Sequence, residues 1–331
     1  MKRLLKIQHP AELSSMATGA SLPVFDAADL IRHAPDAHWV LLDEEGRAAG
    51  RCSLWWQQVP HHAGHRLGLI GHYAVEASEA GHQLLANACN ELAARGCTLA
   101  VGPMDGNTWR RYRFLTEGNG EPPFFLEPAN PPEWPRQFVE DGFKPLANYY
   151  SSVDDRLDED DDPQSQRAAG RLGKLGISLR SLEPARFEEE LKAIYHIVTA
   201  SFRSGFLYQP LAEAEFAAQY ESIRPCLRPE LVTMAMHEDR LAGFIFTLPD
   251  MLQARAGRPI ETAIVKTLAV LPDRRFAGLG SHLLAANRRA ARALGCRRLI
   301  HALMHESNKS RSLSARYAAI FRRYTLFAKP L

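Results

Sequence analysis

A weak internal repeat is the feature that most restricts how this chain can fold. Residues 84–97 (LLANACNELAARGC) align with residues 283–296 (LLAANRRAARALGC), and six of the fourteen positions are identical. Two further matches follow in the same order: residues 45–50 with 238–243, and the pair Asn130 and Phe143 with the pair Asn308 and Phe321. Three matches in the same order indicate that one domain was duplicated. A chain of 331 residues has room for two domains.

The apolar pattern of each half predicts the same series of elements: a hairpin, a strand, a helix that ends in Gly-Cys, and a further strand. In the first half the hairpin is predicted at 39–42 and 52–56, the strand at 67–75, the helix up to residue 97 and the further strand at 99–101. In the second half the hairpin is predicted at 231–236 and 243–248, the strand at 263–270, the helix at 281–294 and the further strand at 299–304. A helix with apolar spacing is also predicted at 187–202. A strand, helix and strand in succession form a βαβ unit with parallel pairing. The sequence therefore predicts an α/β (α+β) fold of two tandem domains, each a mixed twisted sheet with a central βαβ unit flanked by helices.

An acidic run separates the two copies. Residues 154–162 read DDRLDEDDD, in which seven of nine side chains are acidic. Like charges repel and cannot pack together, so this run predicts an exposed linker over residues 154–168, between domains at 1–153 and 169–331. An acidic docking patch is the alternative.

Charge and composition exclude several classes of protein. The formal net charge is +2, so global charge indicates neither nucleic acid nor an anionic membrane as a partner. The five cysteines form no CxxC pair, which argues against zinc and against a disulfide framework. His61, His62 and His65 lack the spacing of a metal site and are expected on a surface loop without metal. No stretch approaches the ~20 apolar residues of a spanning helix, and the sequence predicts a cytoplasmic protein.

The stretch that carries chemistry is KTLAVLPDRRFAGLGSHLLAAN, residues 266–287. A strand ends at Val270, and an R-x-x-G-x-G motif of Arg275, Gly278 and Gly280 opens directly into a helix. Glycines allow close approach of a ligand, and the first N–H groups of a helix form an anion site that suits a pyrophosphate. The longer Rossmann fingerprint and the Walker Gly-Lys-Ser/Thr are both absent. An ordinary glycine-rich turn is the alternative.

This motif resembles that of the GNAT superfamily of N-acetyltransferases over residues 177–331, and the whole chain resembles tandem GNAT proteins. The resemblance implies acetyl-CoA or another acyl-CoA as co-substrate. By position, the residues that would bind it are Leu268, Ala269, Val270, Arg275, Phe276, Ala277, Gly278, Leu279, Gly280, Ser281 and Asn308. The arginines of the following helix, Arg288, Arg289 and Arg292, are expected on a solvated face.

The resemblance further implies an N-acyltransferase, in which a primary amine of a small molecule or peptide attacks the thioester directly. Tyr317, nine residues after Asn308, is the candidate acid, with a packing role as its alternative, and Glu261 is the candidate base. The further candidates are Tyr324 for the acid and His305 and Glu306 for the base. Two other functions remain open: a non-catalytic acyl-CoA-binding or scaffold protein, and a tRNA-dependent aminoacyl transferase.

The first copy lacks the motif. Nine residues separate Val75 from Leu84, whereas thirteen separate Val270 from Leu283. The shorter connection carries glutamates at 76 and 79, and negative charge at a helix start repels a pyrophosphate. The sequence therefore predicts a degenerate GNAT-like domain at 1–153 without a cofactor site. Its insertion at 105–129 is either a cover for the substrate cleft of the second domain or an ordinary packing loop.

Overall fold

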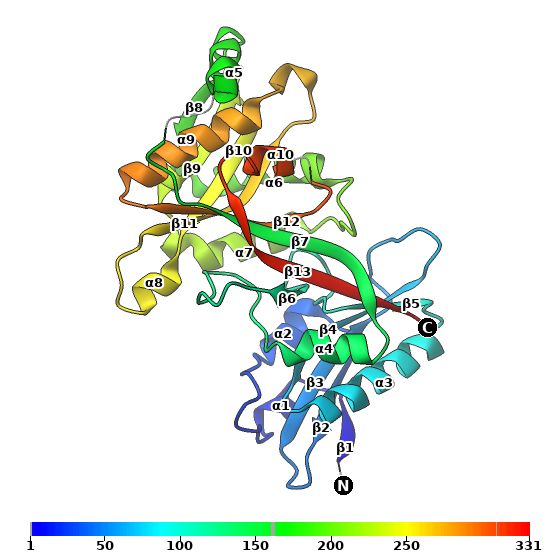
Figure 1. The fold of residues 1–331 in the computed structure, drawn as a ribbon. Helices are drawn as coiled ribbons and strands as arrows, with labels where there is room; N and C mark the ends of the chain where they lie inside the picture. The colour runs from blue at the N-terminus through cyan, green and yellow to red at the C-terminus, as the bar shows by residue number, and fades with distance from the viewer. Residues whose placement is uncertain (1, 160–162, 309) are drawn as a thin grey trace.

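The computed structural model describes residues 2–159, 163–308 and 310–331. Within these residues, thirteen strands form one continuous mixed sheet with the order β1-β2-β3-β4-β5-β13-β7-β12-β11-β10-β9-β8, and β6 pairs with β13 beside this path. The first half of the chain lies at the lower end of the sheet in Figure 1 and the second half at the upper end. No helix of the described residues is long and apolar enough to cross a membrane.

The first half contributes the following elements: β1 (Arg3–Ile7), α1 (Ala11–Ser14), α2 (Ala28–His33), β2 (Ala37–Leu42), β3 (Ala48–Trp55), β4 (Leu67–Val75), α3 (Ser78–Ala94), β5 (Leu99–Gly102), β6 (Phe114–Glu117), α4 (Glu133–Glu140) and β7 (Lys144–Asp154). The predicted hairpin closes on Asp43, whose side chain accepts the N–H of Arg47 at 2.8 Å. Helix α3 then crosses between the parallel strands β4 and β5 and buries Leu84, Leu85 and Leu92 against the sheet.

The second half repeats this arrangement: α5 (Pro163–Lys174), β8 (Ser178–Ser181), α6 (Phe187–Phe202), α7 (Glu213–Ile223), β9 (Val232–His237), β10 (Arg240–Pro249), α8 (Met251–Arg255), β11 (Thr262–Val270), α9 (Leu279–Ala293), β12 (Arg298–His305), α10 (Ser310–Ser314) and β13 (Ala319–Pro330). Four short 3-10 turns connect them at Pro184–Arg186, Arg224–Cys226, Pro229–Leu231 and Arg274–Phe276. Helix α9 crosses between the parallel strands β11 and β12, as α3 does between β4 and β5. The mixed α/β fold with two central βαβ units is therefore confirmed, although the two halves share one continuous sheet where two were predicted.

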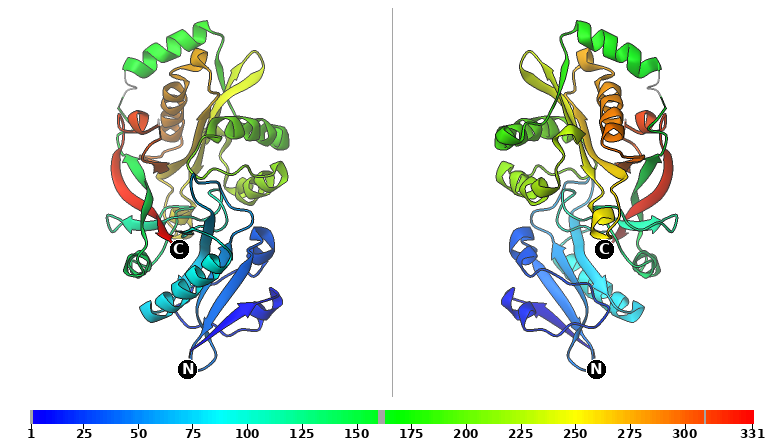
Figure 2. Two further views of the ribbon diagram at one scale, coloured as in Figure 1. Left: turned by 90° about the vertical axis from the view of Figure 1, so that its right-hand side faces the viewer. Right: turned by 90° about the vertical axis from the view of Figure 1, so that its left-hand side faces the viewer.

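The two halves exchange their last strands. Strand β7 follows the first half in sequence but pairs with β12 of the second half, and β13 pairs with β5 of the first half. The exchanged strands β7 and β13 also pair with each other and run side by side through the middle of the molecule (Figures 1 and 2). The strand order therefore reads the same way from either end, as expected of a duplicated domain.

The predicted linker differs from the structure at both ends. Asp154 is fully buried at the end of β7, and its carboxylate lies 2.7 Å from Nε of Arg288, which is also buried rather than solvated. At the other end, α5 already begins at Pro163. Residues 160–162 of the acidic run lie outside the described residues. Asp154 can be buried because Arg288 compensates its charge.

Candidate active site

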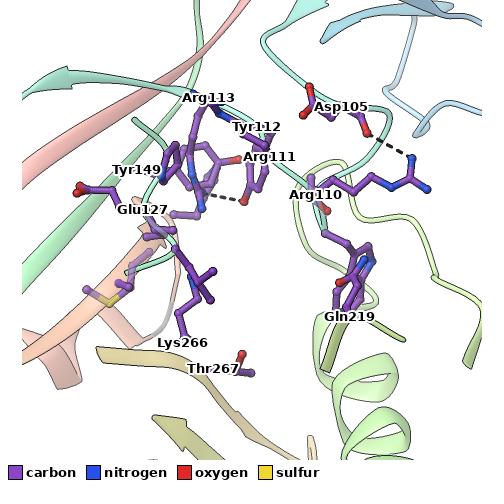
Figure 3. Close-up of a pocket in the computed structure, with 18 of the residues that line it drawn as sticks. Asp105, Arg110, Arg111, Tyr112, Arg113, Glu127, Tyr149, Gln219, Lys266 and Thr267 are labelled. Carbon is purple, nitrogen blue, oxygen red and sulfur yellow. Dashed lines mark hydrogen bonds between the residues drawn. The ribbon is translucent and has the colours of Figure 1, made fainter. Parts of the chain in front are cut away.

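A cleft of about 1360 Å³ lies between the two halves. The first half lines it with β3, β4, the segment 103–114 and the segment 126–129. The second half lines it with the end of α6, the end of α7, β11, β12 and the residues before α10. Figure 3 shows charged and phenolic side chains from both halves pointing into this space.

Strands β11 and β12 separate inside the cleft. They pair only from Thr262 with Arg298 to Val265 with His301. Beyond Val265, no strand of the described residues pairs with this side of β11, and residues 266–268 of this unpaired stretch line the cleft. This stretch includes the predicted Leu268, Ala269 and Val270. An open strand edge can bind an extended ligand through main-chain hydrogen bonds.

A bulge places Lys266 where the two strands begin to separate. The register between β10 and β11 shifts between Phe246 and Thr247, which leaves Lys266 as the extra residue of β11. A bulge redirects a side chain and leaves backbone groups outside the ladder. Lys266 lines the cleft near Arg113 (Figure 3). Burial, together with the charge of Arg113, lowers the pKa of Lys266 to about 8.

The glycine motif forms a cradle at the start of α9. Gly278 has a φ of 83° and precedes the first helical turn, a conformation that a side chain would strain. The carboxylate of Asp273 accepts the N–H of Arg275 at 2.8 Å and shapes the preceding turn. A Cβ on Gly280 would lie 3.3 Å from the side chain of Leu268. The first N–H groups of a helix have no acceptors within it, so the cradle presents donors to an anion.

Helix α5, which the sequence interpretation placed partly in the linker, packs beside this cradle. Arg171 donates to the backbone oxygens of Arg275, at 3.0 Å, and of Ala277. A cavity of about 330 Å³ between α5 and the loop is lined by Arg167, Arg171, Gly278 and Ser281, among others. Two guanidinium groups therefore join the backbone donors, which fits a pyrophosphate. Their contribution was missed because the contact depends on tertiary packing.

The two residues predicted as acid and base do not line the cleft. Tyr317 is buried beneath α5, with its hydroxyl 3.0 Å from that of Ser165 and the guanidinium of Arg288 4.3 Å from its ring centre. Glu261 is exposed beyond the far end of β11, 3.4 Å from Arg297. This geometry favours packing for Tyr317, and both catalytic assignments stay predictions.

The remaining candidates take different places. Asn308 lines the cleft just before α10. His305 also lines it and meets Tyr149 edge to face with ring centres 4.9 Å apart, and burial lowers the pKa of His305. Tyr324 lies in the middle of β13, fully buried, and donates to Glu127. Glu306 pairs with Arg323 at 3.7 Å. Of these four, only Asn308 and His305 face the cleft.

The insertion at 105–129 crosses the cleft and is held to both halves. Arg322 of β13 donates to the backbone oxygens of Glu121 and Pro122, both at 2.7 Å, and pairs with the carboxylate of Glu127. The indole N–H of Trp109 donates to the backbone oxygen of Gln209 at 2.8 Å. The insertion therefore forms part of the cleft wall rather than an independent loop.

In the first half, the place that corresponds to the separated strands is filled by the chain itself. Strand β4 also carries a bulge, at His72, whose N–H donates to Asp105 at 2.6 Å. The N–H of Met104 donates to Ile70 at 2.8 Å, and a Cβ on Gly71 would lie 2.3 Å from the Met104 oxygen. No room is left there for a second extended ligand, which gives a physical reason to expect one cofactor site per chain.

Comparisons with known proteins agree with this geometry. The family model described as "Acetyltransferase (GNAT) family" matches residues 191–316. A "Bacterial ceramide synthase" of Caulobacter vibrioides is 27% identical over 250 residues, which cover 74% of this chain and 62% of that protein. "Protein YghO" of Escherichia coli is 21% identical over 165 residues, 50% of this chain and 42% of that protein. The chain thus spans about six tenths and two fifths of the lengths of these relatives.

Solved structures share the fold of the whole chain. A tandem GNAT protein from the clavulanic acid biosynthesis pathway aligns over 100% of this chain and 98% of its own, with a TM-score of 0.55 and 14% identity. A GCN5-related N-acetyltransferase from Sphaerobacter thermophilus aligns over 92% and 85%, with a TM-score of 0.52 and 14% identity. The GNAT fold generally uses acyl-CoA as co-substrate. The family match thus lies in the second half, which carries the R-x-x-G-x-G motif, and the whole chain shares the fold of a tandem GNAT protein.

Proposed function

We propose that this protein transfers an acyl group from acyl-CoA to a primary amine by direct attack of the amine on the thioester. The proposal rests on one observation: the open edge of β11 leads directly to the glycine cradle at the start of α9. The cradle at 275–281 suits the pyrophosphate, and the open edge of β11 suits the extended arm that leads to the thioester. Together they direct the thioester to the bulge at Lys266.

The cradle has the steric features that this ligand needs. Gly278 and Gly280 allow the loop to pack closely against Ala168 and Leu268 at the start of α9, and Arg167 and Arg171 line the cavity beside it. Charge-assisted hydrogen bonds of this kind are the stronger class. The site suits a pyrophosphate better than a neutral ligand.

Lys266 is the group that we assign to proton transfer. Its pKa of about 8 leaves a fraction of the amine neutral near physiological pH. As the N–C bond forms, neutral Lys266 accepts a proton from the attacking amine; as the C–S bond breaks, it returns that proton to the sulfur. Backbone N–H groups released by the bulge are suited to stabilise the oxyanion. This assignment replaces Tyr317 and Glu261 with a residue that faces the cleft.

The acceptors to test first follow from the relative named as a ceramide synthase, since a ceramide is the N-acyl derivative of a long-chain amino alcohol. The cleft volume of about 1360 Å³ exceeds the ordinary range for one small ligand, roughly 300–1,000 Å³. Room for an acyl chain and a large acceptor together supports this choice. Short primary amines serve as the comparison.

The test is release of free thiol from acetyl-CoA and from a long-chain acyl-CoA, with and without each amine. We expect thiol release that depends on amine and an amide product of matching mass. Gly280→Glu should abolish CoA binding measured by calorimetry, whereas Gly173→Glu, where a side chain enters open space, should not. Tight acyl-CoA binding without amine-dependent release of thiol would favour a non-catalytic acyl-CoA-binding protein instead.

A further inference from the structure

A buried arginine without a partner lines the cleft on the side of the first half. Arg51 of β3 is only 8% exposed, and its Nε atom has no hydrogen-bond partner. In the described part of the chain its guanidinium forms neither an ion pair nor a hydrogen bond, and its contact is the ring of Phe25, whose centre lies 5.0 Å away. A buried guanidinium without an anion is costly, so its presence calls for an explanation.

The groups that surround Arg51 do not neutralise it. Asp105, whose carboxylate acts electrostatically on Arg51, accepts the N–H of His72, and burial raises its pKa to about 6. Its single negative charge also acts on Arg111, so one carboxylate faces two guanidinium groups. Arg111 adds positive charge nearby and, with burial, lowers the pKa of Arg51 to about 10. Burial also holds the pKa of His72 at about 2, so this imidazole is neutral. The charge near Arg51 is therefore positive in the absence of a ligand.

A second buried arginine repeats this pattern closer to Lys266. Arg113 is 5% exposed, and its guanidinium lies between the rings of Tyr112 and Tyr149, 4.0 and 4.2 Å from their centres. It donates to the Tyr112 hydroxyl at 2.7 Å, but no carboxylate of the described residues pairs with it. The acid on this wall, Glu127, is already bound by Arg322 and Tyr324. The cleft as a whole has more buried cations than anions.

We propose that the acceptor amine carries an anionic group, a phosphate or a carboxylate, which Arg51 binds while the amine lies at Lys266. Both residues line the same cavity, so one ligand can reach both. A guanidinium matches either anion through paired hydrogen bonds. This inference rests on the proposed function. It also gives the first half a role: with its own cofactor place filled by Met104 and Asp105, it anchors the acceptor.

The test compares each neutral amine with its phosphate ester: ethanolamine with phosphoethanolamine, and a long-chain amino alcohol with its phosphate. β-Alanine represents a carboxylate. Thiol release gives KM and kcat for each, and we expect the anionic member to have the lower KM. Arg51→Met should raise the KM for that member at least about 30-fold, the loss that follows removal of one partner of a buried charge pair, and leave the neutral amine unchanged. Arg51→Lys should retain part of the preference.

Arg136→Met is the matched control, because Arg136 is exposed on α4 and, within the described ranges, pairs only with Glu133, three residues earlier. It should change no KM. Unfolding temperatures of all variants exclude misfolding, and Arg51→Met should be at least as stable as the wild type because it removes an unpaired buried charge. Equal KM values for the neutral and anionic amines in the wild type, or an equal effect of Arg51→Met on both, would overturn the proposal.

Binding of the amines, measured without acyl-CoA, tests the anion site independently of acyl transfer. If calorimetry finds that phosphoethanolamine binds the wild type but not Arg51→Met, while no amine releases thiol, the anion site stands and acyl transfer fails. If neutral amines are acylated and Arg51 has no effect on any acceptor, acyl transfer stands and the anion site fails.

Discussion

Lys266 should make the protein less stable at neutral pH than a variant that lacks its charge. The fall of its pKa from an ordinary 10.5 to about 8 means that the folded protein disfavours the ammonium form. At 1.36 kcal/mol per pH unit, this corresponds to about 3 kcal/mol. The value is an upper bound because the side chain keeps some contact with the solvent of the cleft.

The sign of the effect determines its pH dependence. Below pH 8 Lys266 is charged in both the folded and the unfolded chain, so the whole cost is present. The destabilisation by the buried ammonium decreases as pH rises from 8 to 10.5, because the folded chain loses the proton of Lys266 in this range before the unfolded chain does. Lys266→Met, which keeps a long apolar side chain, should therefore raise the free energy of unfolding by up to about 3 kcal/mol at pH 7 and by little at pH 10.5.

Urea denaturation from pH 6.5 to 10.5, followed by tryptophan fluorescence, measures this difference. Subtracting the curve of the variant from that of the wild type cancels the groups that titrate in both. Lys192→Met is the control for loss of a lysine outside the cleft, because Lys192 is exposed on α6. A Lys266→Met difference that is constant from pH 7 to 10.5 would refute the inference that the cleft disfavours the ammonium.

Three further results are expected. The kcat/KM for amine acylation should rise with pH through about 8 as Lys266 loses its proton, and Lys266→Arg should remove this rise together with most of the activity. Gly295→Ala, at a φ of 85° with open space around it, should cost about 1 kcal/mol of stability and leave CoA binding intact, by denaturation and calorimetry. Gly278→Ala, at a φ of 83°, should cost more because its Cβ would lie 3.0 Å from that of Ala168, and it should weaken CoA binding. Glu127→Gln should lower the free energy of unfolding by about 3 kcal/mol because it leaves Arg322 buried without its anion, and an unchanged midpoint in urea would contradict this.

Much of the fold could be predicted from local patterns in the sequence. The helix predicted at 187–202 and the strand predicted at 67–75 agree with α6 and β4 at both ends, because apolar periodicity reports directly which face is buried. The glycines of the motif were also informative, since the cradle is formed by consecutive residues. The exchange of β7 and β13 could not be read in this way, because the pairing of distant strands leaves no local period.

The residues to which we assign roles in the cleft could not be predicted from the sequence for one shared reason. Lys266 was seen only as part of a strand, because its bulge depends on the register with β10. Arg51 stands out only through its lack of a partner, which is a property of the packed molecule. Spacing after Asn308 indicated Tyr317, but α5, whose first residues were interpreted as linker, packs over that tyrosine. Sequence identified the motif, whereas tertiary contacts decided which side chains face the cleft.

The exchanged strands bear on how the chain is made. During synthesis the first half emerges early, yet β5 must wait for β13, which begins only at Ala319, before its open edge is covered. Until then the nascent sheet presents unpaired backbone groups of the kind that invite aggregation. A cut in the connection between Asp154 and Pro163 would likewise yield two fragments that each hold a strand of the other's sheet. The two halves are thus expected to acquire their structure as one cooperative unit, and only after β13 has been synthesised.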